Sequence, residues 1–372
     1  MSLFGSKNKS KAVVLIDVTS SSIGGAYAIV SESAPAALLY TTRVALPTTG
    51  ADVPSELMLR ALDEVLQDLR INGAPILHRR TGSGSVQAVV ASVGAPWQTT
   101  NIRTETVVEE KPFLFTDAII AGAKKKGEIP VGRYSSEESV LATLLNGYET
   151  PQPVGKRAKR AEIILLGATM EEETAKLMRR ALSSFSALHE VRFSGLASVV
   201  STAVALAFPH EKEYLALRVS GEVTELVFVK RGHPMFVSHI PSGLNVFARA
   251  AKSTGYASFP DGGDIIDRTK STELDAGLKE AEEAWTTAVA TCLKEFTATH
   301  ALPRTLFLIV DKEAREFIRR VLDVPQVHAL WLSDEPLATI ALECSHFSKN
   351  MACETGVEED LMLGLLALVA RS

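Results

Sequence analysis

Two stretches of this chain share one design, and they lie about two hundred residues apart. In each, an apolar strand leads into a turn of small residues, and two further strands follow. The first begins VVLIDVTSSSIGGAYAIV at Val13, and the second begins YLALRVSGEVTELVFVK at Tyr214. A repeat at this distance predicts two duplicated lobes and not a solenoid of short units. The length of 372 residues also suits two lobes better than one compact core.

The composition narrows the class of protein. With 46% hydrophobic and 22% charged residues, the chain is an ordinary globular protein. The net charge of -5 gives no general attraction to nucleic acid, and the lysine and arginine clusters at 124–126 and 156–160 lack interleaved aromatic residues. We therefore expect no nucleic-acid partner. Three cysteines are too few for a disulfide framework, which favours a reducing, cytoplasmic setting. No apolar run is long enough to span a bilayer.

Between the two repeats the pattern changes twice. The first hairpin is followed by a predicted helix that begins at Pro54 and ends at Gly73, as in an α/β lobe. From Pro96 the chain becomes polar and β-rich, with two short amphipathic helices, which predicts an inserted α+β subdomain. The expected division is a flexible tail (1–11), a first lobe (12–95 and 193–210), an inserted subdomain (96–192), a second lobe (211–354) and a closing helix (355–372).

Two strand–turn–strand units, one in each lobe, resemble the actin-like ATPase fold, an α/β fold of two duplicated ribonuclease H-like lobes. The inserted unit precedes the apolar helix FSGLASVVSTAVALAF, as does the SHS2 subdomain of the PilM and FtsA family. The start MSLFGSKNKSKAVVLIDVTSSS is similar to PilM proteins in particular. The resemblance implies a phosphate-binding hairpin in each lobe, facing the other across a cleft, and a glycine-rich adenosine loop.

The first hairpin departs from the family pattern of Asp, an apolar residue, Gly and Ser or Thr. Asp17 matches, but Thr19 replaces the glycine and brings a β-branched side chain to a place where backbone should approach a phosphate. PilM proteins also tend to carry a lysine where this chain has Gly24. The hydroxyl groups of the turn are supplied by Ser20, Ser21 and Ser22.

The second hairpin departs further. Arg218 stands where the family has an aspartate that holds magnesium through water, and a cation cannot be a metal ligand. Glu222 adds a negative charge to a turn that would face phosphates. The other positions of this vestigial cleft are Ser220, Gly221, Thr224, Glu225 and Gly243. In the adenosine loop, Val310 and Asp311 stand where two glycines are expected.

These alterations predict a pseudo-ATPase with no cofactor, or with weak binding of ATP and magnesium at most. The resemblance then implies a scaffold at the inner face of the cell membrane, in a type IV pilus platform, which binds the cytoplasmic tail of a PilN-like membrane protein. The predicted groove for that tail is lined by Phe113, Ile119, Ile120, Ala123, Leu177 and Met178. The alternative is an ATP-binding switch of FtsA type in cell division, with Glu222 and Glu225 as substitute acids. A sugar or acetate kinase is a more distant third reading, and self-association stays open.

One geometric prediction follows. Because the two turns face each other across the cleft in this fold, we expect Arg218 to point at the opposite lobe and to pair with Asp17 or with Glu222. The competing interpretation places Arg218 on a solvent-exposed strand face.

Overall fold

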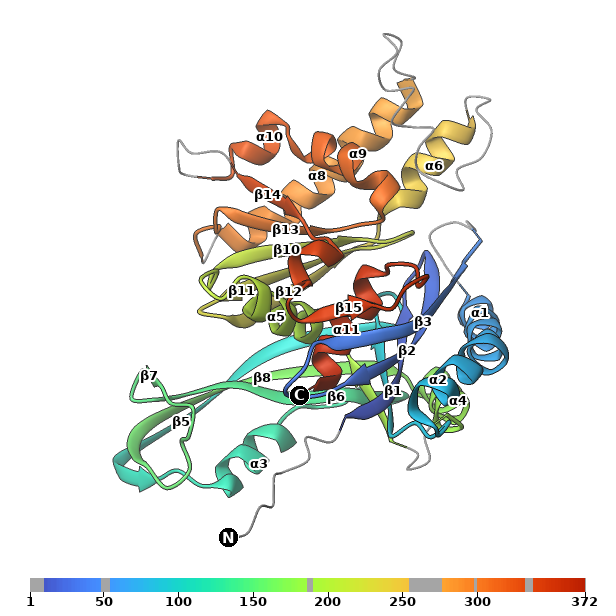
Figure 1. Cartoon of the computed structure of the whole chain (residues 1–372). Coiled ribbons are helices and arrows are strands. Elements are labelled where there is room, and N and C mark those ends of the chain that lie inside the picture. Colours follow the sequence, from blue (N-terminus) through green and yellow to red (C-terminus); the bar gives the residue numbers. More distant parts are fainter. Residues whose placement is uncertain are drawn as a thin grey trace.

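The computed structural model describes residues 10–47, 54–185, 190–253, 276–297, 300–331 and 337–371 (Figure 1). Residues 1–9, most of the predicted tail, lie outside this range. The described strands form three sheets of six, five and four strands. The molecule has the two-lobed α/β fold with an added subdomain that the sequence predicts.

The first two sheets repeat one topology. The first has the order β15-β3-β2-β1-β4-β9 and the second the order β12-β11-β10-β13-β14. In both, three antiparallel strands come first, and two further strands then join in parallel. The strands of the first sheet are β1 (Lys11–Val18), β2 (Ser22–Val30), β3 (Ala36–Ala45), β4 (Ala88–Val93), β9 (Val191–Ser194) and β15 (Met351–Cys353). Those of the second are β10 (Tyr214–Val219), β11 (Thr224–Lys230), β12 (His233–Ile240), β13 (Thr305–Ile309) and β14 (Ala338–Ala341).

The C-terminal segment returns to the first sheet. β15 lies within the range expected for the second lobe, yet it pairs in parallel with β3. α11 (Leu361–Arg371) then packs against β1, β2 and β3 and against α5 (Leu196–Ala207). The first lobe is therefore completed by residues from both ends of the chain.

Strand alternation sets which side chains face the space between the sheets. On β1, Val13 and Leu15 join a core shared with α5, α11 and the even-numbered residues of β10, while Val14 and Ile16 face the opposite side. α5 and α11 thus lie between the two sheets (Figure 1). The outer face of the first sheet packs on α1 (Ser55–Asp68), and that of the second on α6 (Leu244–Ser253), α8 (Ala276–Thr297), α9 (Arg315–Leu322) and α10 (Pro325–His328).

The inserted subdomain is a four-stranded antiparallel sheet of order β5-β8-β6-β7. Its strands are β5 (Gln98–Leu114), β6 (Arg133–Leu145), β7 (Tyr148–Glu149) and β8 (Arg157–Glu171). α3 (Asp117–Lys125) covers one face, where it meets the odd-numbered residues of β8. α4 (Glu172–Ser183) follows β8 and packs on β6, β8, β9 and α1.

The expected helix end at Gly73 is wrong. The chain passes through a short π-helical segment (Leu69–Gly73) into α2 (Ala74–Thr81), which ends at Gly82 with a left-handed φ of 69°. A Cβ at Gly73 would lie 2.8 Å from the Tyr27 ring and 2.9 Å from the Tyr40 ring. Gly73 therefore serves close packing of the helix on the first sheet and does not terminate the helix.

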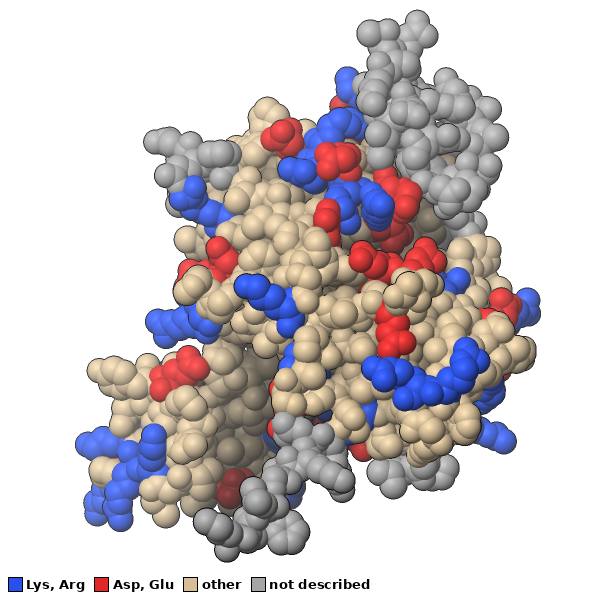
Figure 2. Space-filling view, viewed as in Figure 1, with Lys and Arg blue, Asp and Glu red and all other residues tan. Residues whose placement is uncertain are grey.

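None of the described helices combines the length and the apolar character needed to cross a membrane. On the face shown in Figure 2, acidic and basic side chains are interspersed, without one sign covering the surface.

Candidate functional site

The two hairpin turns close with the same hydrogen bonds. In the first, the backbone N–H and the Oγ1 of Thr19 donate to the Ser22 carbonyl oxygen at 3.0 and 2.9 Å. In the second, the N–H and the Oγ of Ser220 donate to the Val223 carbonyl oxygen at 3.0 and 2.8 Å. Thr19 and Ser220 are thus equivalent positions of the repeat. Both hydroxyl groups donate a hydrogen bond within their own turns.

The turns also touch each other. Ser20 Oγ lies 2.9 Å from Ser220 Oγ and accepts the Glu222 N–H at 2.9 Å. A Cβ at Gly221 would lie 2.7 Å from the Ser20 carbonyl oxygen, so glycine is what permits this approach. The Glu222 N–H of the second turn is therefore satisfied by the first turn.

The backbone N–H groups in the first turn of α6 are also bonded to protein. The N–H groups of Leu244 and Asn245 donate to the carbonyl oxygens of Ser220 and Gly221, each at 2.8 Å. A Cβ at Gly243 would lie 2.2 Å from the Ser220 oxygen, so this position has to be glycine. Free N–H groups at a helix N-terminus form a ready anion site. Here two of them are satisfied by protein.

Arg218 and Asp17 form a buried ion pair between the lobes. Arg218 Nη2 donates to both carboxylate oxygens of Asp17 at 2.8 Å. The two side chains are 5% and 0% exposed. Both residues belong to the alternate set of their strand that faces the space between the sheets. The predicted pairing of Arg218 with Asp17 is confirmed, and the exposed-strand interpretation is wrong.

A second arginine completes the cluster. Arg43 on β3 contacts Asp17 at 3.2 Å, donates through Nε to Asp360 at 2.7 Å and through Nη1 to Ser22 Oγ at 2.8 Å. A Cβ at Gly24 would lie 2.5 Å from the Arg43 guanidinium, so the missing side chain at Gly24 lets Arg43 cross to Asp17. The second cation beside Asp17 therefore comes from the strand β3.

Asp360 anchors the far end of this cluster. Its Oδ1 accepts the Leu363 N–H at 3.0 Å and thereby caps α11. Burial alone would raise the pKa of Asp360, but the charge and hydrogen bond of Arg43 outweigh burial and hold that pKa below its ordinary value. Positive and negative groups thus alternate from Arg218 through Asp17 and Arg43 to Asp360. Sequence reasoning missed Arg43 and Asp360.

The two glutamates of the second hairpin have separate partners. Glu222 accepts hydrogen bonds from Arg249 at 2.7 and 2.9 Å and from Asn245 at 2.8 Å, so it does not pair with Arg218. Glu225 is buried against the 94–95 backbone, and desolvation raises its pKa despite the nearby charge of Arg218. Neither carboxylate is arranged as a metal ligand. Within the described ranges no group of three or more His, Cys, Asp or Glu side chains could hold a metal ion.

The remaining predicted cleft residues have structural roles or lie at its edge. Thr224 donates through Oγ1 to the Ser242 carbonyl oxygen at 2.7 Å and accepts the indole N–H of Trp285 at 3.0 Å. Ser21 Oγ lies 3.0 Å from Thr19 Oγ1. Val310 and Asp311 follow the end of β13, and Asp311 is near enough to feel the charges of Arg43 and Arg218. The residues of this cleft do not fit a magnesium–nucleotide complex. Arg218 already pairs with Asp17, and the two turns are hydrogen-bonded to each other.

The predicted partner groove is not formed as one site. Phe113, Ile119, Ile120 and Ala123 pack on the α3-covered face of the inserted sheet, whereas Met178 lies fully buried in the core under the first sheet. Leu177 is 49% exposed and points away from that core. Figure 1 shows α3 and α4 far apart along the subdomain. Helical periodicity identifies the apolar face of each helix but not the core that the helix joins. The prediction of one groove lined by both helices is wrong for this reason.

The sequence matches no protein-family model and no curated protein sequence. Among solved structures, a chain of the "PilM-PilN type IV pilus biogenesis complex" matches with a TM-score of 0.60 and 15% identity, covering 97% of this chain and 98% of that one. Two others match more loosely: a Bacteroides thetaiotaomicron protein with an actin-like ATPase fold (TM-score 0.46, 8% identity, 100% and 99% covered) and EutJ of Carboxydothermus hydrogenoformans (0.44, 10%, 97% and 90%). The chain therefore has the fold of the matched chain of the PilM–PilN complex.

Proposed function

We propose that this chain is a PilM-like scaffold of a type IV pilus platform. In this role it lies at the cytoplasmic face of the inner membrane and binds the cytoplasmic tail of a PilN-like membrane protein. The observation that carries the proposal is the match to a chain of the PilM–PilN complex, which extends over 97% of this chain and 98% of that one. Agreement over the whole length includes the inserted subdomain as well as both lobes.

The chemistry of the cleft supports a scaffold without ATP turnover. Asp17 is held by two guanidinium groups, and the hairpin turns are bonded to each other and to the start of α6. A magnesium–nucleotide complex would have to displace a buried ion pair and several backbone hydrogen bonds. Peptide recognition at a groove or sheet edge requires none of that machinery.

The test uses the purified chain and a fluorescein-labelled peptide from the cytoplasmic tail of a PilN-like protein of the same genome. We expect saturable binding in fluorescence anisotropy, with the same affinity in the presence and absence of millimolar Mg–ATP. A scrambled peptide of equal composition is the control. If the tail and the scrambled peptide bind equally, or if neither binds, the scaffold proposal is wrong. A tail affinity that depends on Mg–ATP would favour the FtsA-type switch instead.

A further inference from the structure

One face of the inserted sheet is covered by α3, and the other face is open along only part of its length. On β8, Ala161, Ile163 and Leu165 pack in the core under α3. Glu162 and Ile164 alternate with them and therefore face the opposite side. Farther along β8, Met170 on that side packs with α4, and Leu166 lies in the core that includes α5. Around Glu162 and Ile164 the side faces the β11–β12 hairpin of the second lobe, where β12 contacts β5 and β6.

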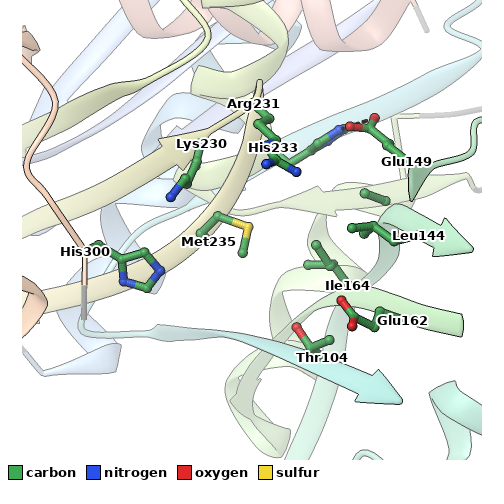
Figure 3. Close-up of a pocket in the computed structure, with 11 residues that line it drawn as sticks. Thr104, Leu144, Glu149, Glu162, Ile164, Lys230, Arg231, His233, Met235 and His300 are labelled. Atoms are coloured by element: carbon green, nitrogen blue, oxygen red, sulfur yellow. Dashed lines mark hydrogen bonds and ion pairs between the residues drawn. The ribbon is translucent and has the colours of Figure 1, made fainter. Parts of the chain in front are cut away.

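A pocket of about 270 Å³ lies between this open face and the hairpin (Figure 3). One wall comes from the inserted subdomain and combines aliphatic side chains with one threonine and two glutamates: Ala142, Leu144, Ile164, Thr104, Glu149 and Glu162. The other comes from the second lobe and carries basic groups. The lining residues that the argument uses are Leu144, Ile164, Met235, Lys230, Arg231 and His233. None of the cleft residues described above contributes to it.

The pocket is lined by two acidic side chains, Glu149 and Glu162, and by two side chains with a permanent positive charge, Lys230 and Arg231. Both acids lie beside another basic side chain: Glu149 is 2.7 Å from His233 Nε2, and Glu162 is 2.6 Å from Arg160. Lys230 and Arg231 have no ion-pair partner within the described part of the chain. These two cations therefore face the pocket without an acid of the chain bonded to them.

The hairpin loop holds these cations at the pocket. Arg231 and Gly232 form the two-residue loop between β11 and β12, with φ of 53° and 81°. Loops with positive φ at both positions favour asparagine followed by glycine, so an arginine in the first position is conformationally unfavourable. Figure 3 shows Lys230, Arg231 and His233 on one side of the pocket and Leu144 and Ile164 on the other.

We propose that this pocket binds a linear peptide segment of a partner protein that presents an aspartate or glutamate beside a leucine-like side chain. The carboxylate would meet Lys230 and Arg231, and the aliphatic group would meet Leu144, Ile164 and Met235. The cavity is smaller than most small-molecule sites and suits one or two side chains. It also adjoins β7, the edge strand of the inserted sheet, whose Tyr148 is 79% exposed, so an extended segment has a strand edge to lie along.

Methyl NMR of the full chain with labelled methionine methyl groups tests the proposal, since Met235 is inside the pocket. The probe is a blocked hexapeptide with a central leucine–aspartate–leucine sequence flanked by glycines. The same peptide with asparagine in place of aspartate is the control. We expect the Met235 signal to shift saturably with the acidic peptide, and the asparagine peptide to bind about tenfold more weakly.

Charge-removing variants locate the site. Arg231→Gln and Lys230→Gln together are expected to weaken binding of the acidic peptide by about tenfold or more. Arg60→Gln is the matched control, because Arg60 is also exposed but lies on α1 outside the pocket. The proposal is wrong if millimolar acidic peptide leaves the Met235 signal unchanged, or if the double variant binds it as the unaltered chain does. This result is independent of the tail-peptide experiment, which uses another ligand.

Discussion

At the scale of single residues, the Arg218–Asp17 pair decides what the cleft can do. Removing one partner of a buried ion pair leaves an uncompensated charge, which is far more costly than replacing both partners. We expect Arg218→Met, which keeps a similar volume, to lower the free energy of unfolding by about 3 kcal/mol. Urea unfolding of the purified variant measures this directly.

Two controls separate the loss of the ion pair from the effect of replacing any arginine by methionine. Arg60→Met on the exposed face of α1 should change stability by no more than about 0.5 kcal/mol. Adding Asp17→Asn to Arg218→Met should recover part of the loss, giving a coupling energy above about 1 kcal/mol in a double-mutant cycle. If Arg218→Met unfolds at the same urea concentration as the unaltered chain, the pair is not the structural tie described here.

Asp360 gives this cluster a pH dependence of known sign. Its pKa is lower in the folded than in the unfolded chain, so its contribution to stability is present above the unfolded pKa, near 4, and is lost as the pH falls through the folded value. Asp360→Asn keeps a side chain that can cap α11 but removes the charge. We expect this variant to be less stable than the unaltered chain at pH 7, with the difference shrinking below about pH 4.

The same urea series on Glu64→Gln controls for general effects of charge, because Glu64 is an exposed acid on α1 with no ion pair among the described residues. The difference between that variant and the unaltered chain should stay nearly constant with pH. A difference for Asp360→Asn that persists unchanged at pH 3 would contradict the ion pair with Arg43.

The residue level also shows what the sequence could and could not predict. Asp17 and Arg218 occupy the same position of a visible repeat, so their meeting across the cleft follows from the fold. Arg43 and Asp360 carry no motif, and 317 residues separate them. Their contact depends on Gly24 leaving room and on the C-terminal segment returning to the first sheet. Neither condition can be read from local pattern.

At the scale of elements, helix propensity and side-chain packing predict opposite effects on stability for a substitution at Gly73. Within a helix, replacing glycine by alanine is expected to stabilise by roughly 1 kcal/mol. At Gly73 the added methyl group would collide with the rings of Tyr27 and Tyr40. We therefore expect Gly73→Ala to destabilise the chain by about 1–3 kcal/mol, the usual effect of overpacking. Thermal and urea unfolding both report it.

Gly84 provides the matched control for that substitution. A Cβ at Gly84 would meet no atom within 4 Å, and its φ is not in the left-handed region. Gly84→Ala should leave stability within about 0.5 kcal/mol of the unaltered chain. If Gly73→Ala is instead the more stable variant, the tyrosine rings are not packed against this glycine.

The helices and strands themselves could be predicted more reliably than the elements against which they pack. The strands of both hairpins, the apolar helix at 196–207 and the β-rich inserted segment were expected from periodicity. The placement of α3 and α4 on different cores was not, because amphipathic periodicity states that a helix has a buried face without saying what buries it. The predicted partner groove failed for this reason.

At the scale of the whole molecule, the two sheets repeat one strand order, and their equivalent turns contact each other directly. In a nucleotide-binding version of this fold, the same turns would hold phosphates between the lobes. Here the ion pair and the turn-to-turn hydrogen bonds connect the lobes directly. The duplicated architecture is thus kept, while the contacts in the cleft contribute to the stability of the folded chain.

Titration calorimetry of the unaltered chain with Mg–ATP tests this account most directly. Since Arg218 pairs with Asp17 and the two hairpin turns are bonded to each other, we predict no saturable heat of binding up to millimolar nucleotide. Saturable binding in the micromolar range that requires magnesium would contradict it.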